Sequence, residues 1–265
     1  MVTIISGIAL LLITLAAFSL FSLKMPKGQA AMSGMANAAV ATFLVEAIMS
    51  YIAGDLFGIS FFKDVGSIAG GMGGVAAAAL VPMGMGASPV LSMCAGVAVG
   101  GYGILPGFIA GYVVGLIGPA IEKKLPEGLD VIVGALVVAS VARAIAAFVN
   151  PGVTMVLSII GKTITEATLT SPIIMGFLLG GIIKMICTSP LSSMALTAML
   201  GLTGLPMGIA AVACFGGSFT NGTIFKRLHF GNNGNVIAVM LEPLTQADIV
   251  TTHPIPIYGS NFFGG

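Results

Sequence analysis

The chain has 265 residues, of which 57% are hydrophobic and only 7% are charged, and its formal net charge is +1. Soluble domains carry about 25% charged residues, so this composition excludes a soluble globular domain or a disordered chain and predicts a polytopic helical protein in a lipid bilayer. The apolar runs are long and continuous, which argues against a β-barrel, and the near-neutral charge gives no basic surface for nucleic acid.

Glycine, proline and polar residues divide the chain into apolar segments. These segments are residues 2–23, 31–53, 66–87, 89–102, 104–121, 129–149, 171–187, 190–203 and 205–221. The first is followed by Lys24 and Lys27, which indicates an uncleaved span with an external N-terminus. A helix needs about 20 residues to cross a bilayer, so segments 89–102 and 190–203 are too short to cross comfortably. We therefore expect an all-α fold of about 8–10 spans that includes broken or re-entrant helices.

Three stretches are more polar than these segments. Residues 54–65 and 150–169 are predicted to lie as amphipathic segments in the membrane interface. Asn150-Pro151 gives the second a helix-start signal, with proline in the first turn. Residues 229–265 hold one short apolar stretch and three prolines, and are predicted to form a re-entrant or surface-packed tail.

An internal repeat is visible at an offset of 100 to 101 residues. Ser88–Met93 (SPVLSM) resembles Ser189–Met194 (SPLSSM), and Gly101–Pro106 (GYGILP) resembles Gly201–Pro206 (GLTGLP). Each half reads as a span, an interfacial segment, a span, a short segment, a span and a basic pair. The single transmembrane domain is therefore divided into a first span (1–30), repeat one (31–125), repeat two (129–228) and the tail (229–265).

The basic pairs predict the orientation. Lys123-Lys124 and Lys226-Arg227 follow the last span of each half, and cytoplasmic loops carry an excess of Lys and Arg. We expect both pairs on the cytoplasmic side if the two short segments cross.

Paired short segments interrupted by Gly and Pro point to the solute site of a transporter, because a broken helix exposes backbone groups at mid-membrane. Here the pair is Gly86–Pro106 and Cys187–Pro206. The candidate binding hydroxyls are those of Ser88, Ser92, Thr188, Ser189, Ser192, Ser193 and Thr197. The alternative is that they cap helices or hydrogen-bond to a neighbouring span.

Charged residues within or near spans are costly and mark candidate functional sites. Glu46 and Arg143 lie deep in their spans and Glu166 lies in the second polar stretch, so all three join the candidate substrate site. For Arg143 the structural alternative is pairing with a carboxylate or backbone carbonyls. Lys184 lies near the end of its span and is expected to extend its ammonium to the interface.

The sequence predicts neither a metal nor a cofactor. Its three cysteines lie far apart in apolar runs, and it has only two histidines, so no metal-ligating spacing occurs. No Ser/His/Asp, Cys/His or His-rich constellation is present, which argues against an enzyme.

The motifs of the second half carry a family resemblance. They are GLDVIV at 128–133, TSPIIMG at 170–176, TSPLSSMAL at 188–196 and LGLTGL at 200–205. Over about residues 128–258 the chain resembles the membrane component (subunit IIC) of phosphotransferase-system sugar transporters, and more narrowly the branch of sugar-specific IIC and perfringolysin-regulator-like proteins. It departs from the complete systems in having no IIA or IIB domain, and Ile164–Glu166 matches the Gly-Ile-Thr-Glu motif of glucose-type IIC proteins only loosely.

The resemblance implies a multi-span permease, homodimeric and located in a bacterial plasma membrane. It also implies that this subunit binds and translocates the solute while a separate cytoplasmic IIB protein carries the phosphoryl group. The leading hypothesis is thus a permease for a small polar metabolite, which is a sugar, sugar acid or polyol. The alternatives are a membrane sensor that binds a ligand without moving it, and a subunit of a larger ion-pumping membrane complex.

Overall fold

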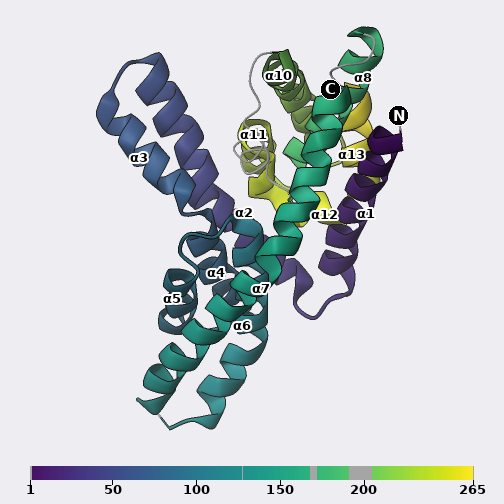
Figure 1. Ribbon diagram of the computed structural model, residues 1–265. Coiled ribbons are helices and arrows are strands. Elements are labelled where there is room, and N and C mark those ends of the chain that lie inside the picture. Colours follow the sequence, from purple (N-terminus) through teal and green to yellow (C-terminus); the bar gives the residue numbers. More distant parts are fainter. Residues whose placement is uncertain (1, 127, 168–171, 191–204, 265) are drawn as a thin grey trace. The chain divides into compact units, whose positions relative to one another are not determined.

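The computed structural model describes residues 2–126, 128–167, 172–190 and 205–264 (Figure 1). All regular secondary structure in these ranges is helical, which confirms the predicted all-α fold. The elements are α1 (Val2–Lys24), α2 (Gly28–Ala39), η1 (Val40–Leu44), η2 (Ala47–Leu56), α3 (Ser60–Gly71), α4 (Gly73–Gly84), α5 (Pro89–Ala98), α6 (Ile104–Lys124), α7 (Leu129–Ala167), α8 (Pro172–Thr188), α10 (Leu205–Arg227), α11 (Asn233–Leu241), η3 (Pro243–Gln246), α12 (Ala247–Thr252) and α13 (Pro254–Gly264). Within the described ranges, four helical stretches are long and apolar enough to cross a membrane, or five if the bent pair α3–α4 is one span.

The chain folds into two compact units. One comprises residues 26–153, and the other comprises residues 1–25 together with 154–265. Helix α7 is continuous and contributes residues to both units. The division into repeats 31–125 and 129–228 concerns internal sequence similarity, and it stays a prediction.

Helix α4 forms the centre of the 26–153 unit, with α2, α5 and α6 packed against it. Its alanines 77–79 are buried. A side chain at Gly107 of α6 would overlap the backbone of Gly74 in α4, and one at Gly34 of α2 would overlap that of Val81. Small residues at helix contacts let membrane helices approach to backbone distance, so this unit is held together by close packing of Gly- and Ala-rich faces.

The first predicted short segment is a half-length helix between two glycine turns. Helix α5 has ten residues, which is about 15 Å at 1.5 Å per residue and half of a bilayer core of about 30 Å. Gly86 (φ +98°) and Gly101 (φ +86°) hold the left-handed backbone conformation on either side, which glycine adopts without steric cost. The predicted interruption within Gly86–Pro106 is confirmed.

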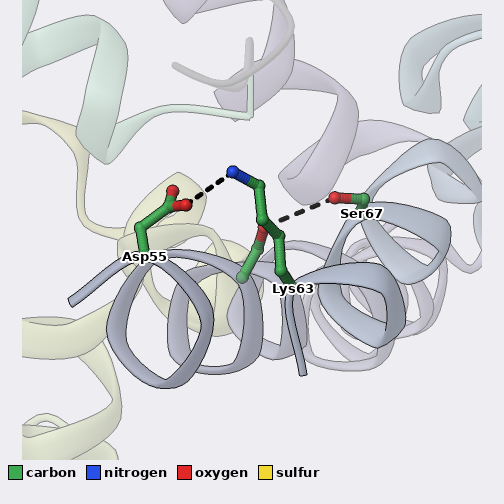
Figure 2. A network of polar contacts seen from close by, with 4 residues as sticks. Asp55, Lys63 and Ser67 are labelled. Carbon is green, nitrogen blue, oxygen red and sulfur yellow. Dashed lines mark hydrogen bonds and ion pairs between the residues drawn. The ribbon is translucent and has the colours of Figure 1, made fainter. Parts of the chain in front are cut away.

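The first predicted interfacial segment, 54–65, is a helical hairpin rather than one amphipathic stretch. Helix η2 ends and α3 begins inside it, and the two helices pack against each other. The Lys63 ammonium lies 2.7 Å from the Asp55 carboxylate across the hairpin (Figure 2). The Ser67 hydroxyl lies 3.4 Å from that of Ser50. The ion pair closes the turn and pairs two of the three charged residues of this segment, the third being Asp64.

The predicted span 66–87 is also interrupted, because α3 and α4 are bent by 58° on either side of Met72. The bend lies inside Gly70–Gly74. Glycine costs a helix about 1 kcal/mol relative to alanine, so a run of glycines is a place where a helix breaks.

The second predicted interfacial segment, 150–169, does not begin a new helix. Helix α7 has 39 residues and Pro151 lies inside it, so the helix-start interpretation of Asn150-Pro151 is wrong. A proline inside a helix removes one backbone donor, but membrane helices tolerate it when neighbouring groups satisfy the freed carbonyl. Apolar residues continue on both sides of Pro151, and helical propagation through them outweighs the single lost hydrogen bond.

In the other unit, α8 packs against α10 and α13, while α1 packs against α12 and α13. The tail is largely helical there. Helix α11 opens with a capping box in which Asn232 and Asn235 exchange side-chain and backbone hydrogen bonds. Helix α13 returns to α8 and α10 and so brings the end of the chain to the predicted site residues Thr188 and Ser189.

Candidate functional site

The second break begins where the sequence predicts it, at the end of α8. The helix ends at Thr188, and both the backbone N–H and the hydroxyl of Ser189 donate to the carbonyl of Ile186, at 3.0 Å and 2.8 Å. Pro190 cannot continue the helical hydrogen bonds. Thr188 and Ser189 are both buried, so a polar helix end lies in the interior of the unit.

Two asparagines extend this polar end into a chain of hydrogen bonds. The Asn221 amide of α10 donates to the Thr188 hydroxyl at 3.4 Å. The Asn261 amide of α13 donates to the Asn221 carbonyl oxygen at 2.6 Å and to the backbone carbonyl of Ile257 at 2.7 Å. Both asparagines are 0% exposed, and the side-chain oxygen of Asn261 accepts no hydrogen bond from any described residue. The chain therefore ends in a buried acceptor.

Sequence reasoning missed both asparagines. Asn221 ends the predicted span 205–221. A buried amide needs a hydrogen-bond partner, so an asparagine at the end of an apolar span could have indicated a polar contact there. Asn261 lies 40 residues further along the chain, and only the return of α13 to α10 brings it to the site.

A buried lysine lies one helical turn before Thr188. Lys184 is 1% exposed, so the expectation that its ammonium extends to the interface is wrong. Its aliphatic stem crosses Gly217 of α10, where an added methyl group would overlap it. Beside it, the sulfur atoms of Cys187 and Cys214 lie 2.9 Å apart. The missing side chain at Gly217 makes room for the lysine between the two helices.

The Glu242 carboxyl is the acidic group that acts on Lys184 electrostatically. It lies between α11 and η3, outside the candidate spans, and accepts the N–H of Leu244 at 3.3 Å. Burial raises the pKa of the Glu242 carboxyl to about 7, against the opposing effects of that hydrogen bond and of the Lys184 charge. Its protonation state therefore changes near neutral pH.

In the 26–153 unit, the two predicted serines occupy structural positions around α5. The Ser88 hydroxyl accepts the N–H of Leu91 at 3.4 Å and caps the helix, while the Ser88 N–H donates to Glu122 at 3.0 Å. Ser92 is 0% exposed, and its hydroxyl has no hydrogen-bond partner among the described residues. Ser88 thus shows the capping alternative, and Ser92 carries an unused donor.

Arg143 binds the other end of α5. Its guanidinium donates to the carbonyls of Ala98 and Gly100 at 3.2 Å and 2.7 Å and lies 4.4 Å from the centre of the Tyr102 ring. The last carbonyls of a helix lack intrahelical partners and carry partial negative charge. Pairing with backbone carbonyls is one of the structural alternatives that the sequence left open for Arg143.

Glu46 lies between η1 and η2, with its carboxylate against Gly70 of α3, where a side chain would overlap it. Ser192, Ser193 and Thr197 lie outside the described residues, as does the side chain of Glu166. Convergence of the Ser88 and Thr188 regions on one solute stays a prediction.

The described residues contain no group of three or more His, Cys, Asp or Glu that could hold a metal ion. The polar groups at the end of α8 are hydroxyls, amides and one ammonium, which bind solutes by hydrogen bonds and charge.

A family model described as "Phosphotransferase system, EIIC" matches residues 29–265. Comparison with curated proteins and with solved structures gives no match.

Proposed function

The chain belongs to the EIIC family of the phosphotransferase system and is a multi-pass membrane subunit of the transporter type, and we propose that it binds and translocates a small polar metabolite. The solute is a sugar, sugar acid or polyol. The protein works as a homodimer in a bacterial plasma membrane, and a separate cytoplasmic IIB protein supplies the phosphoryl group.

The observation that carries this proposal is the buried hydrogen-bond chain of Thr188, Asn221 and Asn261 at the broken end of α8. Hydroxyl and amide groups pair with the hydroxyls of a polar solute. An unsatisfied buried acceptor costs about 1–3 kcal/mol. A solute hydroxyl donating to Asn261 would remove that cost, which favours solute binding at this point.

The three elements that meet here also suggest how binding is linked to movement. Thr188 ends α8, while Asn221 and Asn261 belong to α10 and α13. In transporters, elements that meet at such a site rock against one another during alternating access. A solute that bridges the three elements stabilises the conformation in which they lie close, and its release frees them.

Uptake into proteoliposomes tests the proposal. Radiolabelled glucose, glucitol and gluconate are offered with and without a cytoplasmic fraction that contains IIB proteins. If the parent protein moves no solute under either condition, the permease proposal fails.

Asparagine variants then test the site. Each hydrogen bond to a neutral solute contributes about 0.5–1.5 kcal/mol, so we expect the double variant Asn221→Ala/Asn261→Ala to bind solute about ten-fold or more weakly. Asn233→Ala removes an exposed amide at the start of α11 and should match the parent. Parent-like affinity in the double variant would move the site elsewhere.

A further inference from the structure

Lys184 is a buried ionisable side chain whose ammonium form needs a compensating group. Its side chain is 1% exposed. Moving an ammonium out of water costs several kcal/mol unless a negative group compensates it, and ionisable residues inside membrane proteins mark ion and substrate sites.

The described part of the chain supplies this compensation only in part. The one ion pair within 4.0 Å in that part joins Lys63 and Asp55, so no described carboxylate is in direct contact with Lys184. The groups that act on it electrostatically are Cys187, Cys214 and, among the carboxyls, Glu242. Because its pKa is about 7, Glu242 is partly protonated at neutral pH and leaves the positive charge incompletely balanced.

Lys184 also faces the same contact as the neutral hydrogen-bonding groups. Residues four apart share one face of a helix, so Lys184 and Thr188 lie on one side of α8, and Gly217 and Asn221 lie on one side of α10. These faces meet, because the lysine stem crosses Gly217 and Asn221 donates to Thr188. A positive charge and a row of hydrogen-bonding groups therefore line one contact.

We propose that Lys184 binds a negative charge on the solute, so that the transported solute is a polyhydroxylated anion, such as a sugar acid or a sugar phosphate. This inference rests on the proposed function, excludes neutral sugars and polyols from its substrate class, and adds sugar phosphates to the sugar acids. Carboxylate and phosphate oxygens are the natural partners of an ammonium, while the solute hydroxyls pair with Thr188, Asn221 and Asn261. A neutral sugar would leave the buried charge without its partner.

Purified protein in proteoliposomes tests this when it is offered an aqueous metabolite extract of bacterial cells. The trapped contents are identified by mass spectrometry against empty liposomes, which also separates carboxylates from phosphates. We expect the enriched compounds to be anions. Lys184→Met keeps the packing across Gly217 with a flexible apolar chain, and a lost charge-assisted hydrogen bond is worth about 1.5–3 kcal/mol. Anion accumulation should therefore fall about ten-fold or more in this variant, whereas Lys226→Met, at an exposed site at the end of α10, should match the parent.

The outcomes separate the two proposals. Enrichment of neutral sugars or polyols by the parent would overturn the role of Lys184 and leave the permease standing. Undiminished anion accumulation in Lys184→Met would do the same. No enrichment of any compound would overturn the inference, and if uptake also fails in the presence of IIB proteins, the permease proposal fails with it. If Lys184→Met elutes as an aggregate, the charge of the compounds carried by the parent still decides.

Discussion

The two breaks at Ser88-Pro89 and Ser189-Pro190 carry the same dipeptide, but their polar groups are used differently. At the first, Ser88 caps the start of α5 and Arg143 binds carbonyls at its end. At the second, an amide chain ends in an acceptor of Asn261 with no described partner, and Lys184 is buried in the same unit. At the first break, most polar groups have hydrogen-bond partners within the unit. At the second, the Asn261 oxygen accepts no hydrogen bond from a described residue, and no described carboxylate contacts Lys184.

The difference comes from the neighbouring helices rather than from the break itself. At the first break, α4 presents alanine and glycine, so packing is close and leaves room for few polar groups. At the second, α10 and α13 present asparagines. The shared Ser-Pro pattern therefore marks where helices break, but the residues facing each break decide whether its polar groups are satisfied within the unit.

The largest effect is expected from filling the tight contact of the scaffold. A methyl group at Gly107 would overlap the backbone of Gly74, which cannot move aside by changing a rotamer. Overpacking costs about 1–3 kcal/mol, and we expect Gly107→Ala to lower the free energy of unfolding in detergent by the upper end of that range. Gly152→Ala in α7, where nothing lies within 4 Å, should raise it by up to about 1 kcal/mol. Equal stability of the two variants would show that the α4–α6 contact is looser than described.

The next effect concerns pH and belongs to the second break. The pKa of Glu242 is raised from 4.5 to about 7 in the folded state, so the folded protein binds a proton that the unfolded chain has released in this range. The resulting stabilisation is complete below about pH 4.5 and is lost as pH rises towards about 7. The carboxyl group is buried, but the residue as a whole is partly exposed, so solvent screening reduces the effect and we expect a change on the order of 1–2 kcal/mol.

Thermal unfolding in detergent between about pH 5 and about pH 8 measures this effect. Lys184 and Cys214 are the titratable groups that interact with Glu242. Both stay unchanged and reduced in every variant that is compared. Glu242→Gln should remove the slope, and Asp248→Asn, at a carboxyl outside this cluster, should keep it. A slope that survives in Glu242→Gln would assign it to another group.

A smaller effect is expected at the first break. Arg143→Gln removes the positive charge that binds the carbonyls of Ala98 and Gly100. Because the side chain is exposed, we expect a loss of about 1 kcal/mol in the free energy of unfolding. Solute affinity measured by equilibrium dialysis should stay within about two-fold of the parent. A large loss of affinity with unchanged stability would instead make Arg143 a binding residue.

How much of this structure the sequence predicts depends on how far apart the interacting residues lie along the chain. The breaks at Pro89 and Pro190 were predictable, because proline lacks a donor and clashes with the preceding turn within its own segment. The passage of α7 through Pro151 was not, because it depends on a continuous apolar helix on both sides. The burial of Lys184 was missed for a related reason, since the space for its stem is provided by Gly217 on another helix.

The candidate site shows the same limit. Thr188 and Ser189 follow from a local pattern of hydroxyls around a proline. Asn221 pairs with Thr188 across 33 positions and Asn261 pairs with Asn221 across 40. Pairings at such separations come from how α8, α10 and α13 pack, which low-complexity Gly and Ala sequence specifies weakly.

The smallest change in stability is expected at Gly217, although it bears most directly on the buried lysine. An added methyl group would overlap the Lys184 stem, and the flexible side chain can shift to avoid it. The helix gains about 0.8–1 kcal/mol when alanine replaces glycine, which offsets much of the strain, so the net change should be below about 0.5 kcal/mol. The ammonium, however, is displaced from its position across Gly217, and solute accumulation should fall several-fold. Gly216→Ala is the matched control, because Gly216 is the adjacent residue of α10 and nothing lies within 4 Å of its added methyl group. If Gly217→Ala accumulates solute as well as Gly216→Ala, the position of Lys184 across α10 has no role in binding, and the second break is a scaffold like the first.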